Sequence, residues 1–224
     1  MLRVDGEVVE RAGSAPQTVL RAIGLLDLLA TMPQGMSLRQ LSESTGLTKS
    51  TAHRLISCLV MCRLAEFCPE TRTYKLGIKV LELSAVLLDS MDVREEAKPF
   101  LRHLNDVSRE TVYLAVLDQF KVVYIGCIES PESMRMSERI GRRNPFYSSS
   151  LGKVLVAWAD ESTLNRCVGD REYPAATPRT ITDPVRLIEE LAKVRRQGYA
   201  LDDEENRPGI RCLGAPVRLS LIHI

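Results

Sequence analysis

The chain has 224 residues, of which 45% are hydrophobic and 26% are charged, and its formal net charge is only +1. This composition is too apolar for a disordered protein, and the length allows two modest domains. No apolar run reaches the length of a membrane span and the start has no signal-peptide core, so we expect a cytoplasmic protein that does not bind a membrane.

The N-terminal part begins with residues 1–16, which read as a disordered leader. A helix is predicted after them, because apolar residues recur at helical spacing until Pro33 and Gly35 end the pattern. The residues of this helix predicted to face inward are Val19, Ala22, Ile23, Leu26 and Leu29.

Two short amphipathic helices are predicted between Ser37 and Leu59, on either side of a turn at residues 45–47. Ser37 can cap the first helix, and Gln40 three residues later can complete a capping box. Thr48 can cap the second helix in the same way. The second helix carries one apolar stripe, formed by Ala52, Leu55, Ile56 and Leu59. This arrangement is typical of a helix-turn-helix, whose second helix enters the major groove of DNA.

The polar face of the second helix carries side chains that can bond to base edges and phosphates. The candidate DNA-binding residues are Ser37, Thr48, Lys49, Ser50, Thr51, His53 and Arg54, together with Arg72 in the segment that follows. Residues 48–75 hold five Lys/Arg and two Asp/Glu, a small basic excess that favours contact with a phosphate backbone. Because any surface helix has a polar face, the alternative is a small-molecule sensor or dimerisation module whose helix-turn-helix contacts a protein instead of DNA.

Two short strands, residues 64–67 and 73–76, are predicted directly after the second helix, with a turn between them. A hairpin in this place is a wing, so residues 17–76 are assigned to a winged helix-turn-helix DNA-binding domain. Residues 77–91 follow as a helix with apolar residues on two sides. Such a helix needs two partners, which predicts a linker that takes part in dimerisation.

The remaining residues, 92–224, show a mixed pattern of helices and strands. The predicted helices cover residues 93–107, 148–158 and 184–197, and the predicted strands cover residues 112–116, 121–128, 134–140, 199–201 and 209–217. The apolar residues whose spacing predicts the first of these helices are Val93, Ala97, Phe100, Leu101, Leu104 and Val107. The pattern predicts an α+β domain built on an antiparallel sheet.

Six cysteines, at positions 58, 62, 68, 127, 167 and 212, show no CxxC pair and no histidine at metal-ligand spacing. We therefore expect reduced packing residues, with no metal site and no cofactor. Gly152-Lys153 lacks the other residues of a phosphate-binding loop, and Cys212 as a nucleophile would have only His103 as a base. The sequence consequently predicts no catalytic residues and no enzyme.

Several segments, in order along the chain, resemble the IclR family of bacterial transcriptional regulators. They are residues 51–55 (TAHRL), 74–77 (YKLG), 148–153 (SSSLGK), 198–205 (GYALDDEE) and 209–217 (GIRCLGAPV). The resemblance implies a winged-helix DNA-binding domain, a linker helix and a GAF-like effector-binding domain. It also implies homodimers or dimers of dimers on palindromic operators in double-stranded DNA.

An effector pocket follows from the same resemblance. Carried over by motif, its residues are Met136, Asn144, Ser150, Leu151, Asp202, Ile210 and Cys212. Unpaired N–H groups at a helix start favour an anion, so a small organic acid would suit the turn from Ser149 to Gly152. Asp202 would repel a carboxylate, and it would instead accept a hydrogen bond from an effector hydroxyl or orient a neighbour. The other reading of Asp202 is a residue in a solvated acidic loop.

Three features depart from the family pattern. Related wings usually place a glycine where this chain has Arg72, which could alter the turn and add a phosphate contact. Asn144 and Ser150 stand where small or apolar residues are frequent, so the pocket is expected to be more polar. The ending, Leu219 to Ile224, resembles no part of the family continuation, so the effector-binding domain is expected to be C-terminally truncated.

Overall fold

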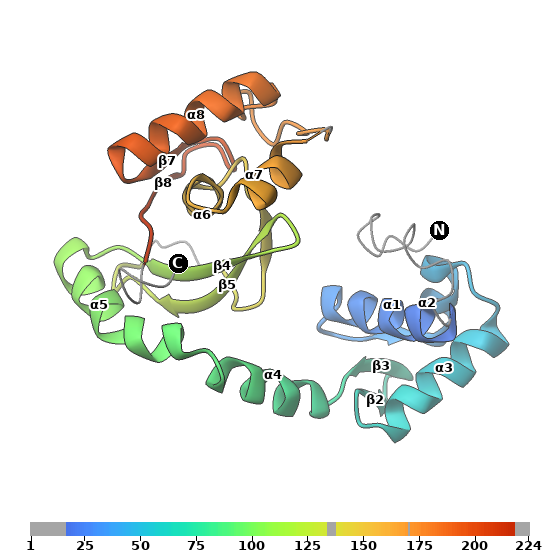
Figure 1. Cartoon of the computed structure of the whole chain (residues 1–224). Helices are drawn as coiled ribbons and strands as arrows, with labels where there is room; N and C mark the ends of the chain where they lie inside the picture. Colours follow the sequence, from blue (N-terminus) through green and yellow to red (C-terminus); the bar gives the residue numbers. More distant parts are fainter. Residues whose placement is uncertain (1–16, 134–137, 170, 218–224) are drawn as a thin grey trace. The chain divides into compact units, whose positions relative to one another are not determined.

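The computed structural model describes residues 17–133, 138–169 and 171–217. The chain divides into two compact units, Met1–Ser90 and Met91–Ile224, which are described separately (Figure 1). The leader predicted for residues 1–16 and the ending at residues 219–224 lie outside the described residues.

The first unit combines helices with a small antiparallel sheet. Its elements are α1 (Gln17–Thr31), β1 (Met36–Ser37), α2 (Leu38–Thr45), α3 (Lys49–Met61), β2 (Ala65–Cys68), β3 (Thr73–Leu76) and α4 (Lys79–Asp89). The sheet has the order β1-β3-β2, so both wing strands are confirmed, with β2 starting one residue later than predicted. Strand β1 was not predicted, because two residues are too few to show a periodic pattern.

The starts of α2 and α3 are set by their N-cap residues. The Ser37 hydroxyl accepts a hydrogen bond from the Gln40 backbone N–H at 3.3 Å, and the Gln40 side chain accepts one from the Ser37 backbone N–H at 2.8 Å. The predicted capping box is therefore confirmed. The Thr48 hydroxyl accepts a hydrogen bond from the Thr51 backbone N–H at 3.3 Å. Between the two helices Gly46 has a φ of 69°, a left-handed conformation that glycine adopts without steric cost.

The core of the first unit lies between α1, α2, α3 and the sheet. The predicted stripe of α3 is buried there: Ala52, Leu55, Ile56 and Leu59. On α1 the prediction is partly wrong. Leu29 is buried and Ala22 and Leu26 pack against the core as predicted, whereas Val19 and Ile23 are 56% and 46% exposed. The reason is that α1 carries two apolar stripes, and only the one with Leu25 and Leu29 packs on the core of its own unit.

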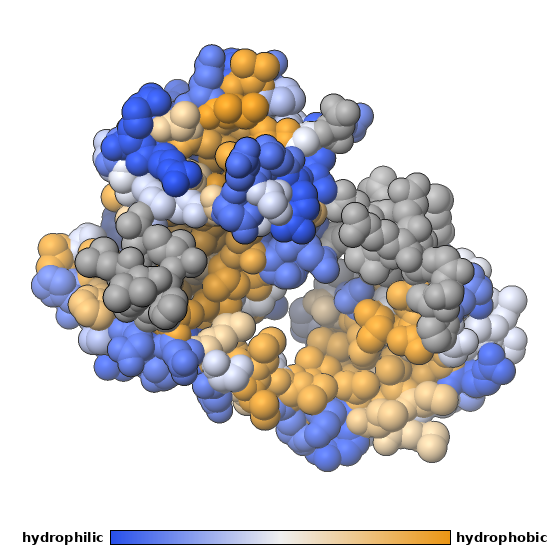
Figure 2. Space-filling view, in the orientation of Figure 1, coloured by the Kyte–Doolittle hydropathy of each residue, from blue (hydrophilic) through white to orange (hydrophobic). Residues whose placement is uncertain are grey.

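Helix α4 buries none of its residues among the described parts of the chain. Leu81, Val86 and Leu87 are 63%, 71% and 58% exposed. Figure 2 shows apolar surface, in orange, where α4 runs in Figure 1. An apolar helix with so much exposed surface fits the expectation that it needs further partners.

The second unit is α+β, as predicted. Its elements are α5 (Asp92–Ser108), β4 (Val112–Asp118), β5 (Lys121–Ile128), β6 (Arg143–Pro145), α6 (Ser150–Ala157), α7 (Glu161–Val168), α8 (Pro184–Gln197), β7 (Ala200–Asp203) and β8 (Arg211–Gly214). Strands β4, β5 and β6 form one antiparallel sheet, while β7 and β8 form a second. Both sheets are antiparallel, which confirms the predicted α+β class with antiparallel pairing.

The third strand of the first sheet is not where the alternating pattern placed it. Of the predicted residues 134–140, the first four lie outside the described residues and residues 138–140 form no strand. The strand is β6, in which Asn144 pairs with Val122 of β5. Strand β8 is likewise shorter than predicted. Both differences have the same cause. Whether a segment forms a strand depends on the strand with which it pairs, and the alternation of apolar and polar residues within the segment does not identify that strand.

Helix α5 covers the predicted range, but only Ala97 and Leu101 are buried. Phe100, Leu104 and Val107 are 70%, 54% and 72% exposed. Helix α5 packs on β4 and β5 with one face, and its second apolar stripe is uncovered in the described chain.

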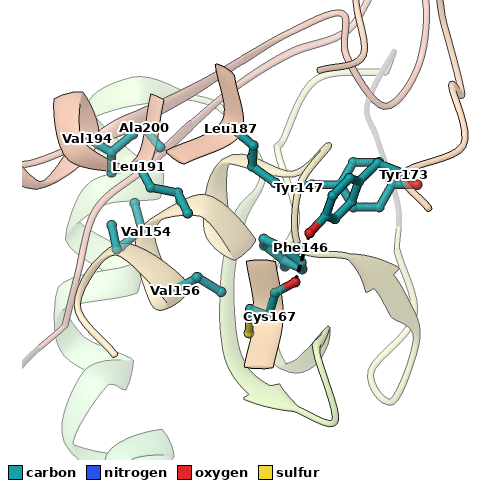
Figure 3. Packing of buried hydrophobic residues seen from close by; sticks show 11 residues of the cluster. Phe146, Tyr147, Val154, Val156, Cys167, Tyr173, Leu187, Leu191, Val194 and Ala200 are labelled. Carbon is teal, nitrogen blue, oxygen red and sulfur yellow. Dashed lines mark hydrogen bonds between the residues drawn. The ribbon is translucent and has the colours of Figure 1, made fainter. Parts of the chain in front are cut away.

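The core of the second unit forms around α6, most of whose residues are buried. Figure 3 shows side chains of α8, among them Leu191, directed toward Val154 of α6. Helix α8 is confirmed with its capping Asp183 and with Gly198 at its end. Helix α7, which was not predicted, places Cys167 in the same core.

Candidate DNA-binding and effector sites

The polar face of α3 presents five of the predicted DNA-binding residues on one surface. Lys49, Ser50, His53 and Arg54 are exposed, and Thr51 is half-buried. The apolar stripe of the same helix is buried in the core, so these side chains project from a fixed element. This is the arrangement that lets a recognition helix contact base edges and phosphates together.

The other two predicted residues of the helix-turn-helix use their hydroxyl groups as caps. Ser37 is engaged with Gln40 in the capping box of α2. The Thr48 hydroxyl lies 3.1 Å from the hydroxyl of Ser50 and 3.0 Å from that of Thr51. These bonds order the first turn of α3, and contact of either capping residue with DNA remains a prediction.

Three predicted cations make no ion pair with any described residue: Lys49, Arg54 and Arg72. By contrast, Arg39 on α2 is paired with Glu43 at 2.7 Å, and Lys75 on β3 with Glu66 at 3.6 Å. An exposed cation without a partner keeps its charge available for a phosphate.

In the turn of the wing, Arg72 adopts a backbone conformation that is typical of glycine. Arg72 has a φ of 53°, in the left-handed region that favours glycine. The departure from the family pattern therefore leaves the conformation of the turn in place and adds a cation between β2 and β3.

In the second unit, the start of α6 lies in the interior. The Ser149 hydroxyl accepts a hydrogen bond from the Gly152 backbone N–H at 3.4 Å, and both Ser149 and Ser150 are buried. A side-chain carbon added at Gly214 of β8 would lie 2.8 Å from the Ser150 carbonyl group. This close approach requires a glycine, and it brings β8 against the helix start where an anion was predicted to bind.

Asp202 and Cys212 are direct partners across β7 and β8. Asp202 is 3% exposed, so the solvated-loop reading is wrong. Its Oδ1 accepts hydrogen bonds from the backbone N–H groups of Glu205 at 2.8 Å and Asn206 at 3.3 Å. Burial raises the pKa of the Asp202 carboxyl, and these two hydrogen bonds oppose the shift.

The Cys212 thiol is protonated at neutral pH. Burial, followed by the negative charges of Asp202 and Glu138, raises its pKa to about 11. A thiol of this kind is a poor nucleophile, because the thiolate is the reactive form.

Asn144 on β6 is buried beside two tyrosines. Its side-chain amide donates a hydrogen bond to the Tyr124 hydroxyl at 3.1 Å, and the Tyr124 ring packs edge-on against Tyr113 at 5.1 Å. Burial is the main cause of the raised pKa of Tyr124, to which the negative charge of Glu138 adds. Asn144 is thereby connected to the side of the site that holds Cys212.

The remaining predicted pocket residues are less well defined. Leu151 is half-buried in the first turn of α6, Ile210 is half-buried just before β8, and Met136 lies outside the described residues. The structure therefore joins the start of α6 with β7 and β8, and it places Asn144 beside them through Tyr124.

A buried lysine three residues beyond Ser150 was missed in the sequence. Lys153 is 0% exposed, and its Nζ lies 2.6 Å from Glu205 Oε1 and 3.7 Å from Glu190 Oε1 of α8. Burial raises the pKa of Glu205, and the Lys153 ammonium opposes this shift. The available signal was a lysine among apolar residues in a helix, since a buried lysine is nearly always paired.

The described residues form two surface depressions. One of about 430 Å³ is lined by Val168, Arg171 and Pro184, and one of about 360 Å³ by Thr177 and Arg179. Neither is lined by a predicted effector residue.

The described cysteines are free, but they are not all packing residues. Cys167 is buried as expected, whereas Cys58 and Cys62 are exposed, because they lie outside the apolar stripe of α3. The described His, Cys, Asp and Glu residues form no group of three or more that could hold a metal ion. Among the described helices, none has the length and apolar character needed to cross a membrane.

Two family models match the chain. The model described as IclR helix-turn-helix domain matches residues 18–68, and the one described as bacterial transcriptional regulator IclR C-terminal matches residues 85–220. The HTH-type transcriptional regulator XynR of Escherichia coli K12 is 38% identical over 201 residues, which cover 90% of this chain and 80% of XynR. The regulator KdgR of the same strain is 35% identical, over 93% of this chain and 79% of KdgR.

A solved structure supports the same relationship. The IclR transcriptional regulator from Alicyclobacillus acidocaldarius is 30% identical with a TM-score of 0.78, covering 90% of this chain and 82% of that chain. Since the relatives are named as transcriptional regulators with a helix-turn-helix, the N-terminal motif is a DNA-binding one and the protein is not an enzyme. The chain belongs to the IclR family of bacterial transcriptional regulators.

Proposed function

We propose that the protein is a ligand-responsive transcriptional regulator that binds a palindromic operator and is modulated by a small organic acid. The observation that carries the proposal is the exposed face of α3, where Lys49 and Arg54 project without ion pairs among described residues. Two protomers related by a two-fold axis would read half-sites about one helical turn apart, or a multiple of it. The place of action would be the bacterial cytoplasm, where the chromosome lies.

We assign the contact between two protomers to α4, both in a homodimer and in each pair within a dimer of dimers. The support is the exposed apolar surface formed by Leu81, Val86 and Leu87. Contiguous apolar surface of this kind is typical of protein–protein interfaces.

For the effector, we assign the carboxylate to the start of α6. The first N–H groups of a helix have no partner within the helix, and the helix dipole favours an anion at this end. The Ser148 hydroxyl next to this position is buried without a hydrogen bond to any described residue. A bound acid would supply partners to these groups.

The DNA part is tested by Arg54→Ala, with Arg39→Ala as the charge-matched control. Loss of Arg54 should weaken operator binding by about 1–3 kcal/mol if the side chain reads a guanine. Arg39 is already paired with Glu43, so its loss should have little effect. Fluorescence anisotropy with an operator duplex selected from random DNA, at several salt concentrations, measures both. Equal affinity of Arg54→Ala and the wild type would remove this face from the interface, and binding independent of salt would argue against phosphate contacts.

The effector part is tested by Ser150→Glu, which places a negative charge where the carboxylate would bind. This variant should lose the response to organic acids. Ser162→Glu is the matched control, because Ser162 also lies in the first turn of a helix but is exposed. A Ser150→Glu protein that responds at the same acid concentration as the wild type would show that the effector binds elsewhere.

A further inference from the structure

Buried acceptor atoms without partners mark a polar part of the effector site. Both carboxylate oxygens of Glu138, the hydroxyl of Ser148 and one oxygen of Glu205 accept no hydrogen bond from the described residues. The Glu205 oxygen belongs to the carboxylate that is paired with Lys153. Glu138 has no such buried partner, although its side chain is only 1% exposed. Leaving buried acceptors unsatisfied costs free energy, so these atoms indicate a hydrogen-bond donor from outside the described chain.

Two arginines and a tyrosine hold Glu138 in place. Arg142 Nε lies 2.8 Å from one carboxylate oxygen, and a terminal nitrogen of Arg207 lies 2.9 Å from the other. These contacts balance the charge, but their directions do not satisfy hydrogen-bond geometry, so the oxygens can still accept from a donor. The Glu138 backbone N–H donates a hydrogen bond to the Tyr113 hydroxyl at 2.8 Å.

Glu138 borders the same site as the predicted effector residues. Tyr113, to which it is bonded, packs on Tyr124, and Tyr124 is bonded to Asn144. Arg207 lies in the turn between β7 and β8, which ties Glu138 to the strands that carry Asp202 and Cys212. Contacts on two sides therefore place the Glu138 carboxylate at this site.

We propose that Glu138 determines the specificity of the effector site, and that the effector is a small carboxylic acid carrying hydroxyl groups. This inference rests on the proposed effector function. The acid group would lie at the start of α6, while hydroxyl groups of the same molecule donate hydrogen bonds to Glu138. An acid with an apolar body would leave the buried carboxylate oxygens without partners. Sites built to bond a hydroxyl reject analogues that lack it far more strongly than apolar pockets reject a change of size.

The test uses the full chain and two matched pairs of acids. Lactate is compared with propionate and gluconate with hexanoate, since the members of each pair share one carboxylate and the same number of carbon atoms. Isothermal titration calorimetry should show the hydroxylated member of at least one pair binding at least about tenfold more tightly, because a hydrogen bond to a charged acceptor contributes that much. Glu138→Leu should abolish this preference. Glu132→Leu is the control, because Glu132 is an exposed carboxylate whose side chain is paired with Arg109.

Several results would overturn the inference. Wild-type protein that binds propionate and hexanoate as tightly as lactate and gluconate has no hydroxyl preference, and a preference that survives in Glu138→Leu does not arise from Glu138. If Glu138→Leu has a lowered Tm, Glu138→Gln serves instead. It keeps the shape but replaces one acceptor by a donor, so a smaller loss of preference is expected and an unchanged preference counts against Glu138.

The same preparations separate this inference from the proposed function. In one outcome, acids bind to the wild type and Ser150→Glu abolishes the response, but hydroxylated acids are not preferred. In that outcome only the inference about Glu138 fails. If none of the four acids binds, both this inference and the organic-acid part of the proposed function fail. Operator binding without acid then shows whether the DNA-binding part holds.

Discussion

The face of α3 and the surroundings of α6 are built by different kinds of contact. On α3, capping bonds that span three residues and one apolar stripe present exposed polar side chains. Around α6, the buried charged groups that pair with each other come from residues far apart in the sequence. Lys153 and Glu205, for example, are 52 positions apart. Exposed recognition surfaces therefore follow from local sequence, whereas a buried polar site depends on the complete fold of its unit.

This contrast predicts the largest effect for the buried lysine. Lys153→Met removes the partner of Glu205 and leaves a buried carboxylate without its counter-charge, so the second unit should lose about 3–5 kcal/mol of stability. Urea unfolding followed by fluorescence measures this unit alone, because the one tryptophan of the chain, Trp158, lies there.

Lys193→Met is the control for this prediction. The Lys193 side chain is 56% exposed and pairs with Glu190 at 3.3 Å, so its loss should cost less than about 1 kcal/mol. If Lys153→Met lowered the stability no more than Lys193→Met does, the buried Lys153–Glu205 pair would not be the contact that holds the turn after β7 against α6.

Thiol reactivity should differ between the two regions by about two orders of magnitude. The rise of the Cys212 pKa from 9.0 to about 11 lowers its thiolate fraction at pH 8, and hence its alkylation rate, about 100-fold. Cys58 and Cys62 are exposed on α3 and should react first. Iodoacetamide labelling at pH 8 followed by peptide mass spectrometry gives the order, and Cys212 should gain reactivity as the pH approaches 11. Prompt labelling of Cys212 at pH 8 would be incompatible with its burial beside two carboxylates.

The smallest of the expected effects concerns the local contacts of α3. Thr48→Ala removes the N-cap and should destabilise the helix by about 0.5–2 kcal/mol. Faster hydrogen exchange over residues 49–61 would report it. Thr31→Ala removes a comparable hydroxyl, bonded to the Leu28 carbonyl at the end of α1, and should leave this exchange unchanged. Identical exchange in both variants would show that the cap does not order the first turn.

The sequence was sufficient where the signals are local. The capping box at Ser37, the left-handed turn at Gly46 and the stripe of α3 were all predictable, because each depends on residues within one or two helical turns. It was also sufficient for α8, whose capping Asp183 and closing Gly198 are local signals of the same kind.

The sequence was insufficient where contacts are distant. Strand β6 was misplaced because its partner β5 lies in another segment. The inward face of α1 was partly misjudged because an apolar stripe does not show which element covers it. The same limit applies to the effector site. Asn144 and Ser150 came from the family motif, whereas Glu138 and Lys153 required knowledge of which buried charges the fold brings together.

The central claim, that α3 reads a palindromic operator, is tested most directly by selecting duplex DNA from a random pool with the full chain and with Arg54→Ala. The wild type should select dyad-symmetric sequences with half-sites about one helical turn apart, or a multiple of it. Arg54→Ala should lose base preference at one position in each half-site. A wild-type selection without dyad symmetry, or the same base preferences in both selections, would contradict the claim.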